Sequence, residues 1–223
     1  MSQYFDKDFT LFFKELEKNN NKVWFDANRP RYEKNIKTPF FNFIEALIDE
    51  VSKIDKDLLI DPKAAIFRFN KDVRFSKDKS PYKLHCSAAI AKGGRKDHVN
   101  PGFYLEFTAN KIAYYSGIYM ADTKTLKSIR EYISDNNDEF NKLLKDKKFK
   151  TTFGELYGEK SKVLPKEMKE IANTQPYIYN KQFLLVKEWK GSFITDKNLM
   201  KELIQTFENG RAMRAFLYEA SIY

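Results

Sequence analysis

The stretch RFNKDVRFSKDKSPYKLH, residues 68–85, decides which fold we predict for this chain. Apolar and polar side chains alternate from Phe67 onward, which is the period-2 pattern of a half-buried β-strand. The alternation predicts a strand over residues 67–75, and a turn rich in lysine and proline follows it. A second strand is predicted from Lys83 to Ala91.

Two more strands are predicted further along the chain. Phe103, Leu105 and Phe107 alternate with polar neighbours, and residues 111–120 follow after the short turn at Ala109 and Asn110. Short connections favour antiparallel neighbours. We therefore predict a region that is mainly β over residues 64–120, with a meander of about four strands.

The preceding region, residues 1–60, shows helical periodicity instead. Apolar side chains recur at i, i+3, i+4 and i+7 from Phe9 to Leu16 and again from Phe40 to Val51. Thr38 and Pro39 have the residue types of an N-cap and a first helical position, so we expect a new helix to begin there.

Residues 121–223 are predicted to be mainly helical, with an extended piece near residues 183–186. Asp122 or Thr123 is the expected cap of the first helix, and Gly210 is expected to weaken or break the last one. The order helices, strands, helices predicts an α+β fold. We expect one domain over residues 1–223, with an antiparallel sheet flanked by N- and C-terminal helices.

The net charge is positive, because forty basic residues face thirty-one acidic ones and leave a formal charge of +9. A field of this sign attracts nucleic acid or anionic metabolites. Part of the excess has a genomic explanation, since lysine, asparagine, phenylalanine, isoleucine and tyrosine all have AT-rich codons. The few arginines are then the more informative cations, because a guanidinium offers a planar fork and a permanent charge.

Cys86 is the only cysteine, so no intramolecular disulfide forms, which fits a reducing compartment. We expect Cys86 to be a small core residue. The first residues lack the apolar core of a signal peptide, and the most apolar run is too short to span a bilayer. These features predict a soluble, cytoplasmic protein without a membrane partner. They leave the oligomeric state open.

The opening stretch also contains the predicted ligand-binding residues. A strand without a bulge places Arg68 and Arg74 on one sheet face, and the turn adds Lys79 and Lys83. Converging Arg and Lys side chains hold phosphate or carboxylate groups in proteins. We therefore predict that an anionic small molecule binds at this face, with Tyr82 packed against the ligand or the sheet.

Three alternative roles for these residues stay open. The arginines could instead form structural ion pairs with Asp72, Asp78 or Glu106 across the sheet. The protein could be an enzyme acting on phosphorylated or nucleic-acid substrates, with Asp72, His85 or Glu106 as general acid or base. It could also be a nucleic-acid or protein interaction module, although no specific nucleic-acid motif is present.

Signatures of established catalytic or cofactor sites are missing from the sequence. It has no H-E-x-x-H or G-x-S-x-G motif, and its two histidines are His85 and His98. Residues 93–95 lack the spacing of a phosphate-binding loop, so we predict a hairpin turn there. We expect neither a cofactor nor a metal site.

Three segments resemble a microbial family catalogued as a domain of unknown function. The motif R-x-x-x-D-x-R-F-[ST]-x-[DN]-K-[ST]-P-Y-K is here Arg68 to Lys83. The run NNNKVWFDANRPRYE, residues 19–33, is similar to the N-terminal signature of that family, and FGELYGEKSKVLPKEM, residues 153–168, is similar to its C-terminal part. The chain departs from the family at Pro30, and it lacks the usual C-terminal Arg-Gly and His-Pro elements. The resemblance implies that the central motif is important, and it implies no reaction.

Overall fold

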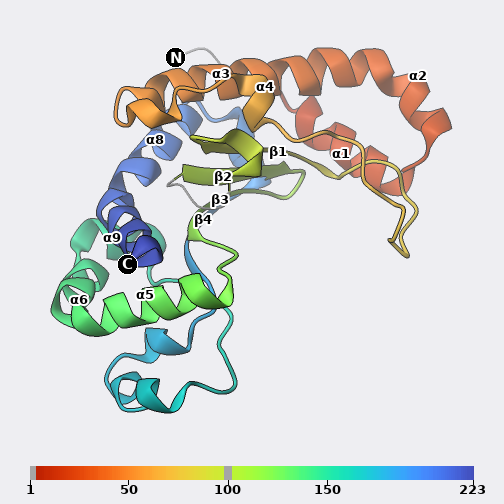
Figure 1. Cartoon of the computed structure of the whole chain (residues 1–223). Helices are drawn as coiled ribbons and strands as arrows, with labels where there is room; N and C mark the ends of the chain where they lie inside the picture. The colour runs from red at the N-terminus through yellow and green to blue at the C-terminus, as the bar shows by residue number, and fades with distance from the viewer. Residues whose placement is uncertain (1–3, 98–101) are drawn as a thin grey trace.

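A four-stranded antiparallel sheet lies between two groups of helices (Figure 1). The computed structural model describes residues 4–97 and 102–223. Before the sheet come α1 (Asp8–Lys18), α2 (Lys22–Tyr32), α3 (Thr38–Ser52) and α4 (Pro62–Ala65). The strands are β1 (His85–Ala91), β2 (Gly102–Thr108), β3 (Lys111–Ile118) and β4 (Phe183–Lys190), in the order β1-β2-β3-β4. The remaining helices are α5 (Thr123–Asp135), α6 (Asn137–Lys145), α7 (Lys147–Phe153), α8 (Leu199–Asn209) and α9 (Arg211–Ile222). The predicted α+β fold is confirmed.

The strand predicted over residues 67–75 does not form. Within this segment only Asn70 forms a bridge, with Tyr82, and Ile66 just before it forms a second isolated bridge with Ala88. The Asp72 carboxylate accepts a hydrogen bond from the backbone N–H of Arg74, 3.3 Å away, and such a local turn competes with strand pairing. The fourth strand is instead β4, where only a short extended piece was predicted.

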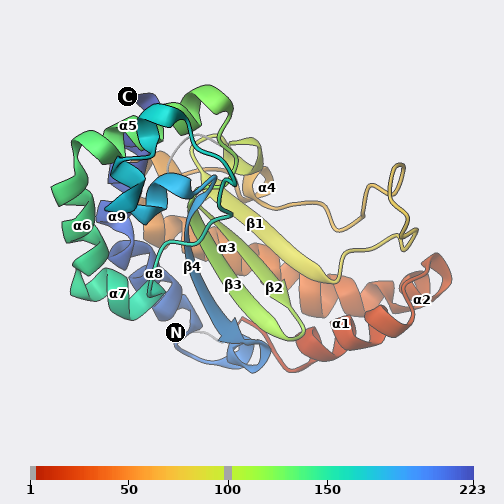
Figure 2. The ribbon, with the colours of Figure 1, turned by 90° about the horizontal axis from the view of Figure 1, so that it is seen from below.

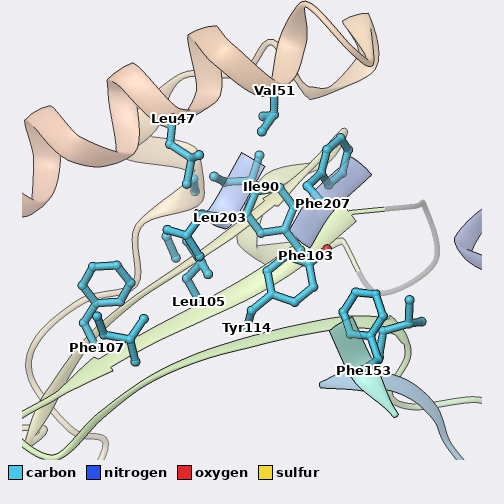
Figure 3. Packing of buried hydrophobic residues seen from close by; sticks show 14 of the residues in the cluster. Leu47, Val51, Ile90, Phe103, Leu105, Phe107, Tyr114, Phe153, Leu203 and Phe207 are labelled. Carbon is cyan, nitrogen blue, oxygen red and sulfur yellow. The ribbon is translucent and has the colours of Figure 1, made fainter. Parts of the chain in front are cut away.

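The core lies on the sheet face that α3 and α8 cover (Figure 3). Phe103, Leu105 and Phe107 of β2 are buried, while the residues between them are partly exposed, as the alternation predicted. Helix α3 contributes Leu47 and Val51 to the same cluster. The opposite face of the sheet, called the outer face below, points away from α3 and is seen in Figure 2.

The helix predicted to begin at Thr38 is continuous with the helix before it. Lys37 has helical dihedral angles, and no side chain caps α3. Between α2 and α3 the chain widens into a π-helical turn, in which the Thr38 N–H donates to the Glu33 carbonyl five residues earlier. Pro39 has no N–H to donate, and its ring crowds the carbonyl four residues before it. The wider turn accommodates this proline without ending the helix.

The C-terminal helices follow the sequence pattern closely. Asp122 caps α5 by accepting a hydrogen bond from the Thr125 N–H at 2.7 Å, and Gly210 separates α8 from α9. Within residues 4–97 and 102–223, no helix is both long and apolar enough to cross a membrane.

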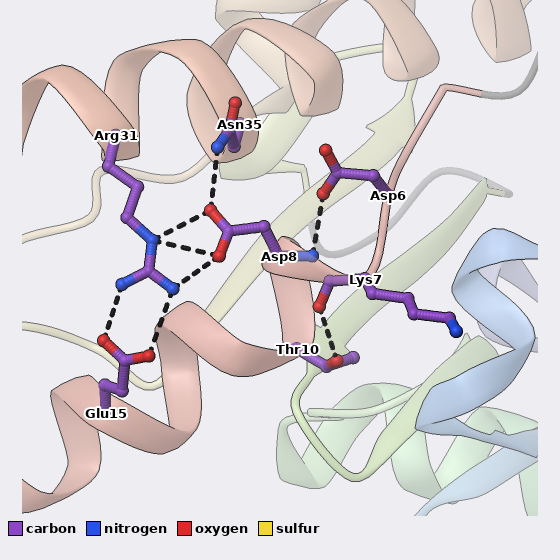
Figure 4. A network of polar contacts seen from close by, with 7 residues as sticks. All are labelled: Asp6, Lys7, Asp8, Thr10, Glu15, Arg31 and Asn35. Atoms are coloured by element: carbon purple, nitrogen blue, oxygen red, sulfur yellow. Dashed lines mark hydrogen bonds and ion pairs between the residues drawn. The ribbon is translucent and has the colours of Figure 1, made fainter.

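Arg31 ties α2 to the start of α1 (Figure 4). Its Nε donates to Asp8 Oδ2 at 2.8 Å and its Nη1 to Glu15 Oε2 at 2.6 Å. Asn35 Nδ2 also donates to Asp8, at 2.7 Å. The side chains of Arg31 and Asp8 are each 24% exposed, so this pair is screened less than the other ion pairs of these helices. The hydrogen bond from Arg31 holds the pKa of Asp8 below its usual value.

We expect the substitution Arg31→Gln to destabilise the protein by about 2 kcal/mol, because it leaves a half-buried carboxylate without its charged donor. For a chain of this size the melting temperature would fall by roughly 4–8 °C, which differential scanning calorimetry measures. Arg29→Gln is the matched control, since Arg29 pairs with Asp26 on the exposed surface. We expect it to change stability by less than about 0.5 kcal/mol. Equal effects of the two substitutions would contradict this role of Arg31.

Candidate functional site

Residues 67–83 form an arm that projects from the sheet in the direction of α2 (Figures 1 and 2). Asn20, in the turn between α1 and α2, holds the arm at Tyr82. Its Nδ2 donates to the Tyr82 carbonyl at 2.9 Å, and its Oδ1 accepts from the Tyr82 N–H at 3.1 Å. The Tyr82 ring is only 6% exposed and packs on Phe25 and Phe69, with centroids 4.2 and 5.5 Å away. Tyr82 therefore anchors the arm, and it lines neither of the two cavities described below.

The outer end of the arm is exposed and paired internally. Arg74 donates from Nε and Nη2 to the two oxygens of Asp72, at 2.9 and 2.7 Å, and its side chain is 75% exposed. Lys79 Nζ closes the turn by donating to the Val73 carbonyl at 3.0 Å. Arg68 approaches Asp72 less closely, at 3.6 Å. Because Arg74 occupies both oxygens of Asp72, the guanidinium of Arg68 keeps most of its donors available.

A cavity of about 570 Å³ lies at the base of the arm, between the start of α3, α4 and the first residues of β1. We call it the cationic cavity. It is lined by six basic side chains: Lys37, Lys63, Arg68, Lys83, Arg95 and Lys96. His85 and several aromatic rings complete its wall, and among the described residues no Asp or Glu lines it. Arg74, Lys79 and Tyr82 lie outside it.

Lys83 is the most enclosed of the predicted cations. Its Nζ lies 5.4 Å from the centre of the Phe67 ring, and burial lowers the pKa of its ammonium group, with the nearby Arg68 charge acting in the same direction. The Glu106 charge acts on this pKa in the opposite direction and does not cancel the shift. An anion in the cavity would stabilise the protonated form of Lys83.

Arg95 has a structural contact within the same wall. Its Nη1 donates to the backbone carbonyls of Lys63, Ala64 and Ile66, at 2.5, 3.1 and 3.3 Å. These bonds hold α4 and the base of the arm against the short helical turn Gly94–Lys96. Gly94 has φ of +64° and begins this short helical turn. The hairpin turn expected over residues 93–95 stays a prediction, because the connection to β2 runs through residues outside the described part of the chain.

His85 and Glu106, two of the predicted acid–base residues, lie side by side on neighbouring strands. His85 Nε2 is 3.9 Å from Glu106 Oε2. The Tyr104 hydroxyl donates to the same carboxylate at 3.2 Å, and burial raises the pKa of Tyr104 to about 12. Burial lowers the pKa of His85, and the Glu106 charge opposes that shift. Asp72, the third candidate, lies in the exposed part of the arm.

Of the other predicted chemical residues, Cys86 also lines the cationic cavity. Cys86 is buried, as predicted, and burial raises the pKa of its thiol. His98 lies outside the described residues. Across residues 4–97 and 102–223, no group of three His, Cys, Asp or Glu side chains is placed to hold a metal ion.

Sequence reasoning missed three of the lysines that line the cavity: Lys37, Lys63 and Lys96. Each lies on a different element, in a stretch without a recognisable motif. Their approach to Arg68 and Lys83 is a property of the tertiary fold, so the sequence pattern carried no signal of it.

We expect the substitution Glu106→Gln to lower the pKa of His85 further, because it removes the negative charge that stabilises the imidazolium. NMR titration of the imidazole signals measures this pKa, with His85→Asn for assignment. Glu188→Gln is the control, since Glu188 lies on β4 and pairs with Lys111. An unchanged or higher pKa of His85 in Glu106→Gln would show that the two side chains do not interact.

Comparison with known proteins places the chain in a family. A search among curated proteins finds no match. A family model matches residues 8–216, which include the arm and every element of the sheet. The chain therefore belongs to the family described as conserved hypothetical protein (DUF2461), a domain of unknown function, as its resemblance to such a family predicted.

Proposed function

We propose that this protein binds an anionic ligand, bearing phosphate or carboxylate, in the cationic cavity. The observation that carries this proposal is the lining of that cavity, which has six Lys and Arg side chains and no described acidic one. Concave sites with a few convergent charged groups are the usual form of ligand pockets, and the volume of about 570 Å³ is within their range.

The charge balance of the cavity supports the same proposal. Lys37 is paired with Glu33 at 2.8 Å. In the described part of the chain, Lys63 and Lys83 have no carboxylate within salt-bridge distance. Like charges gathered in one cavity repel one another, and an anion bound among them relieves this repulsion. Arg68 and Lys83 are the predicted ligand-binding residues that line the cavity, and Arg68 adds a planar guanidinium suited to a phosphate or carboxylate.

Arg74, Lys79 and Tyr82 support the ligand indirectly in this proposal. Arg74 holds Asp72, Lys79 closes the turn, and Tyr82 fixes the arm to α2. These contacts position Arg68 at the mouth of the cavity.

We expect inorganic pyrophosphate or citrate to stabilise the wild-type protein against heat. A ligand at a hundred times its Kd stabilises by about 2.7 kcal/mol, which raises the melting temperature of such a chain by roughly 5–10 °C. Arg68→Gln and Lys83→Gln should each weaken binding about tenfold or more, as isothermal titration calorimetry measures, because each removes a charged donor.

Lys77→Gln and Arg211→Gln are the matched controls, since both side chains are exposed and neither lines the cavity. They should bind the anion as the wild type does. Equal weakening in the controls, or no binding by the wild type, would contradict the proposal. A steep fall of affinity with salt would point instead to a diffuse nucleic-acid surface, because many released counterions drive that kind of binding.

Acid–base chemistry on the same ligand is a second candidate function. His85 lines the cationic cavity, and its lowered pKa favours the neutral imidazole, which accepts protons. Glu106, 3.9 Å from it, stabilises the imidazolium that forms. In this second proposal, His85 acts as a general base on a phosphate ester bound in the cationic cavity.

We expect His85→Asn to lower any turnover of phosphate esters by about 10²–10⁴-fold while pyrophosphate binding is retained, since a general base contributes a factor of this size. A panel of phosphomonoesters and phosphodiesters, assayed with and without divalent cations, measures this. No turnover by the wild type across the panel would leave binding as the function. Equal turnover in His85→Asn would remove His85 from this role.

A further inference from the structure

A second cavity, of about 500 Å³, opens on the outer face of the sheet next to the cationic cavity. We call it the tyrosine groove. Its wall includes three tyrosines, Tyr104, Tyr115 and Tyr119, and two carboxylates, Glu106 and Asp97. Phe67 and Arg95 line both cavities. The two cavities are therefore neighbours that share part of one wall.

Contacts across the shared wall show how closely the cavities meet. His85 of the cationic cavity lies 3.9 Å from Glu106 of the tyrosine groove. The Phe67 ring has Lys83 Nζ over its face at 5.4 Å and contacts Tyr104 edge-on, with centroids 5.8 Å apart. The boundary between the cavities thus consists of a few side chains at the edge of the sheet. Lys83 of one cavity and Tyr104 of the other therefore contact the same Phe67 ring.

The aromatic side chains of the tyrosine groove are suited to bind a flat ring by stacking. Tyr104 and Tyr115 are paired directly across β2 and β3, and their ring centroids are 6.1 Å apart. Aromatic side chains on a sheet surface stack with nucleic-acid bases, because every base has a π-face. Tyr119 adds an exposed ring at the end of the groove.

Glu106 adds a hydrogen-bond acceptor to the wall of this groove. Its carboxylate accepts one hydrogen bond from the Tyr104 hydroxyl, and an ionised carboxylate has about four acceptor sites. Glu106 lines the groove, and a ring amino group is a suitable donor to its remaining acceptor sites. Carboxylates recognise the exocyclic amino group of cytosine in this way.

We propose that the ligand of the cationic cavity is a nucleotide. Its phosphate lies near Arg68 and Lys83, its base lies on Tyr104 and Tyr115, and Glu106 accepts a hydrogen bond from the base. This inference rests on the proposed function and names the class of its ligand. A nucleotide combines an anionic group with a flat ring that carries hydrogen-bond donors, and the sugar joins the two at the boundary between the cavities.

Calorimetric titration of the full chain tests the inference with inorganic pyrophosphate, ribose 5-phosphate and the four nucleoside monophosphates AMP, CMP, GMP and UMP. We expect the best nucleotide to bind at least about tenfold more tightly than ribose 5-phosphate, which is a typical contribution of one stacked base. Tyr104→Leu and Tyr115→Leu should each reduce this advantage and leave the affinity for ribose 5-phosphate unchanged.

Glu106→Gln is the variant that preserves shape, and it should weaken the binding of a nucleotide with an amino group without weakening pyrophosphate. Tyr223→Leu is the matched control, because Tyr223 is exposed at the end of α9, away from both cavities. A 5′-phosphorylated tetranucleotide separates two sources of the ligand. If the tetranucleotide binds as tightly as the mononucleotide, and if this binding depends on Tyr104, the natural ligand is the 5′ end of a nucleic-acid strand. Weaker binding assigns it to a free nucleotide.

Three results would overturn the inference, and they are distinguishable. If pyrophosphate and ribose 5-phosphate bind but no nucleotide binds more tightly than ribose 5-phosphate, the nucleotide assignment fails and the proposed function stands. If none of these phosphate probes binds and citrate does not bind either, both fail. A nucleotide advantage that survives in Tyr104→Leu and Tyr115→Leu would place the base elsewhere and also overturn the inference.

Discussion

The two hydrogen bonds between Asn20 and the backbone of Tyr82 are the contact on which the candidate site depends. The arm pairs with its neighbours only through isolated bridges, so it has no regular ladder to satisfy its backbone groups. Asn20 supplies one donor and one acceptor at the point where the arm returns to β1. The rings of Phe25, Phe69 and Tyr82 pack there, and this packing fixes the positions of Arg68 and Lys83 on either side.

Electrostatics then distinguishes the two ends of the arm. At the outer end Arg74 is paired with Asp72, so its charge is balanced within the arm itself. At the base, Lys83 is held against Phe67 and near Arg68, and burial lowers the pKa of its ammonium group although the Glu106 charge acts in the opposite direction. A structural ion pair thus accounts for Arg74, whereas the surplus of positive charge gathers in the cationic cavity. That surplus is the physical basis of the proposed anion binding.

Sequence patterns predicted the elements that are governed by local periodicity. The alternation of Phe103, Leu105 and Phe107 predicted β2, and Asp122 was correctly expected to cap α5. The prediction of a strand over residues 67–75 was wrong, because the hydrogen bond of Asp72 with the Arg74 N–H turns the chain locally and overrides the alternating pattern. The prediction that a new helix begins at Thr38 was wrong, because a π-helical turn joins α2 to α3 and the helix continues through Pro39.

The candidate site was predictable only in part, for a related reason. Arg68, Lys83 and His85 lie within one stretch of the sequence, and the structure brings them to one cavity. Lys63 lies on α4, and Lys96 lies on the short turn after β1. Arg95 holds these two elements together by donating hydrogen bonds to backbone carbonyls of α4, and this contact brings both lysines to the cavity. Such long-range contacts leave no periodic signal. The pairing of β4 with β3 is a similar case, since more than sixty residues separate the two strands.

A crystal structure of the protein soaked in pyrophosphate tests the central claim most directly, since it locates the anion without relying on a variant. The account predicts an ordered pyrophosphate in the cationic cavity, within hydrogen-bond distance of Arg68 and Lys83. An anion found only at exposed lysines outside the cavity, with the cavity occupied by water, would contradict it.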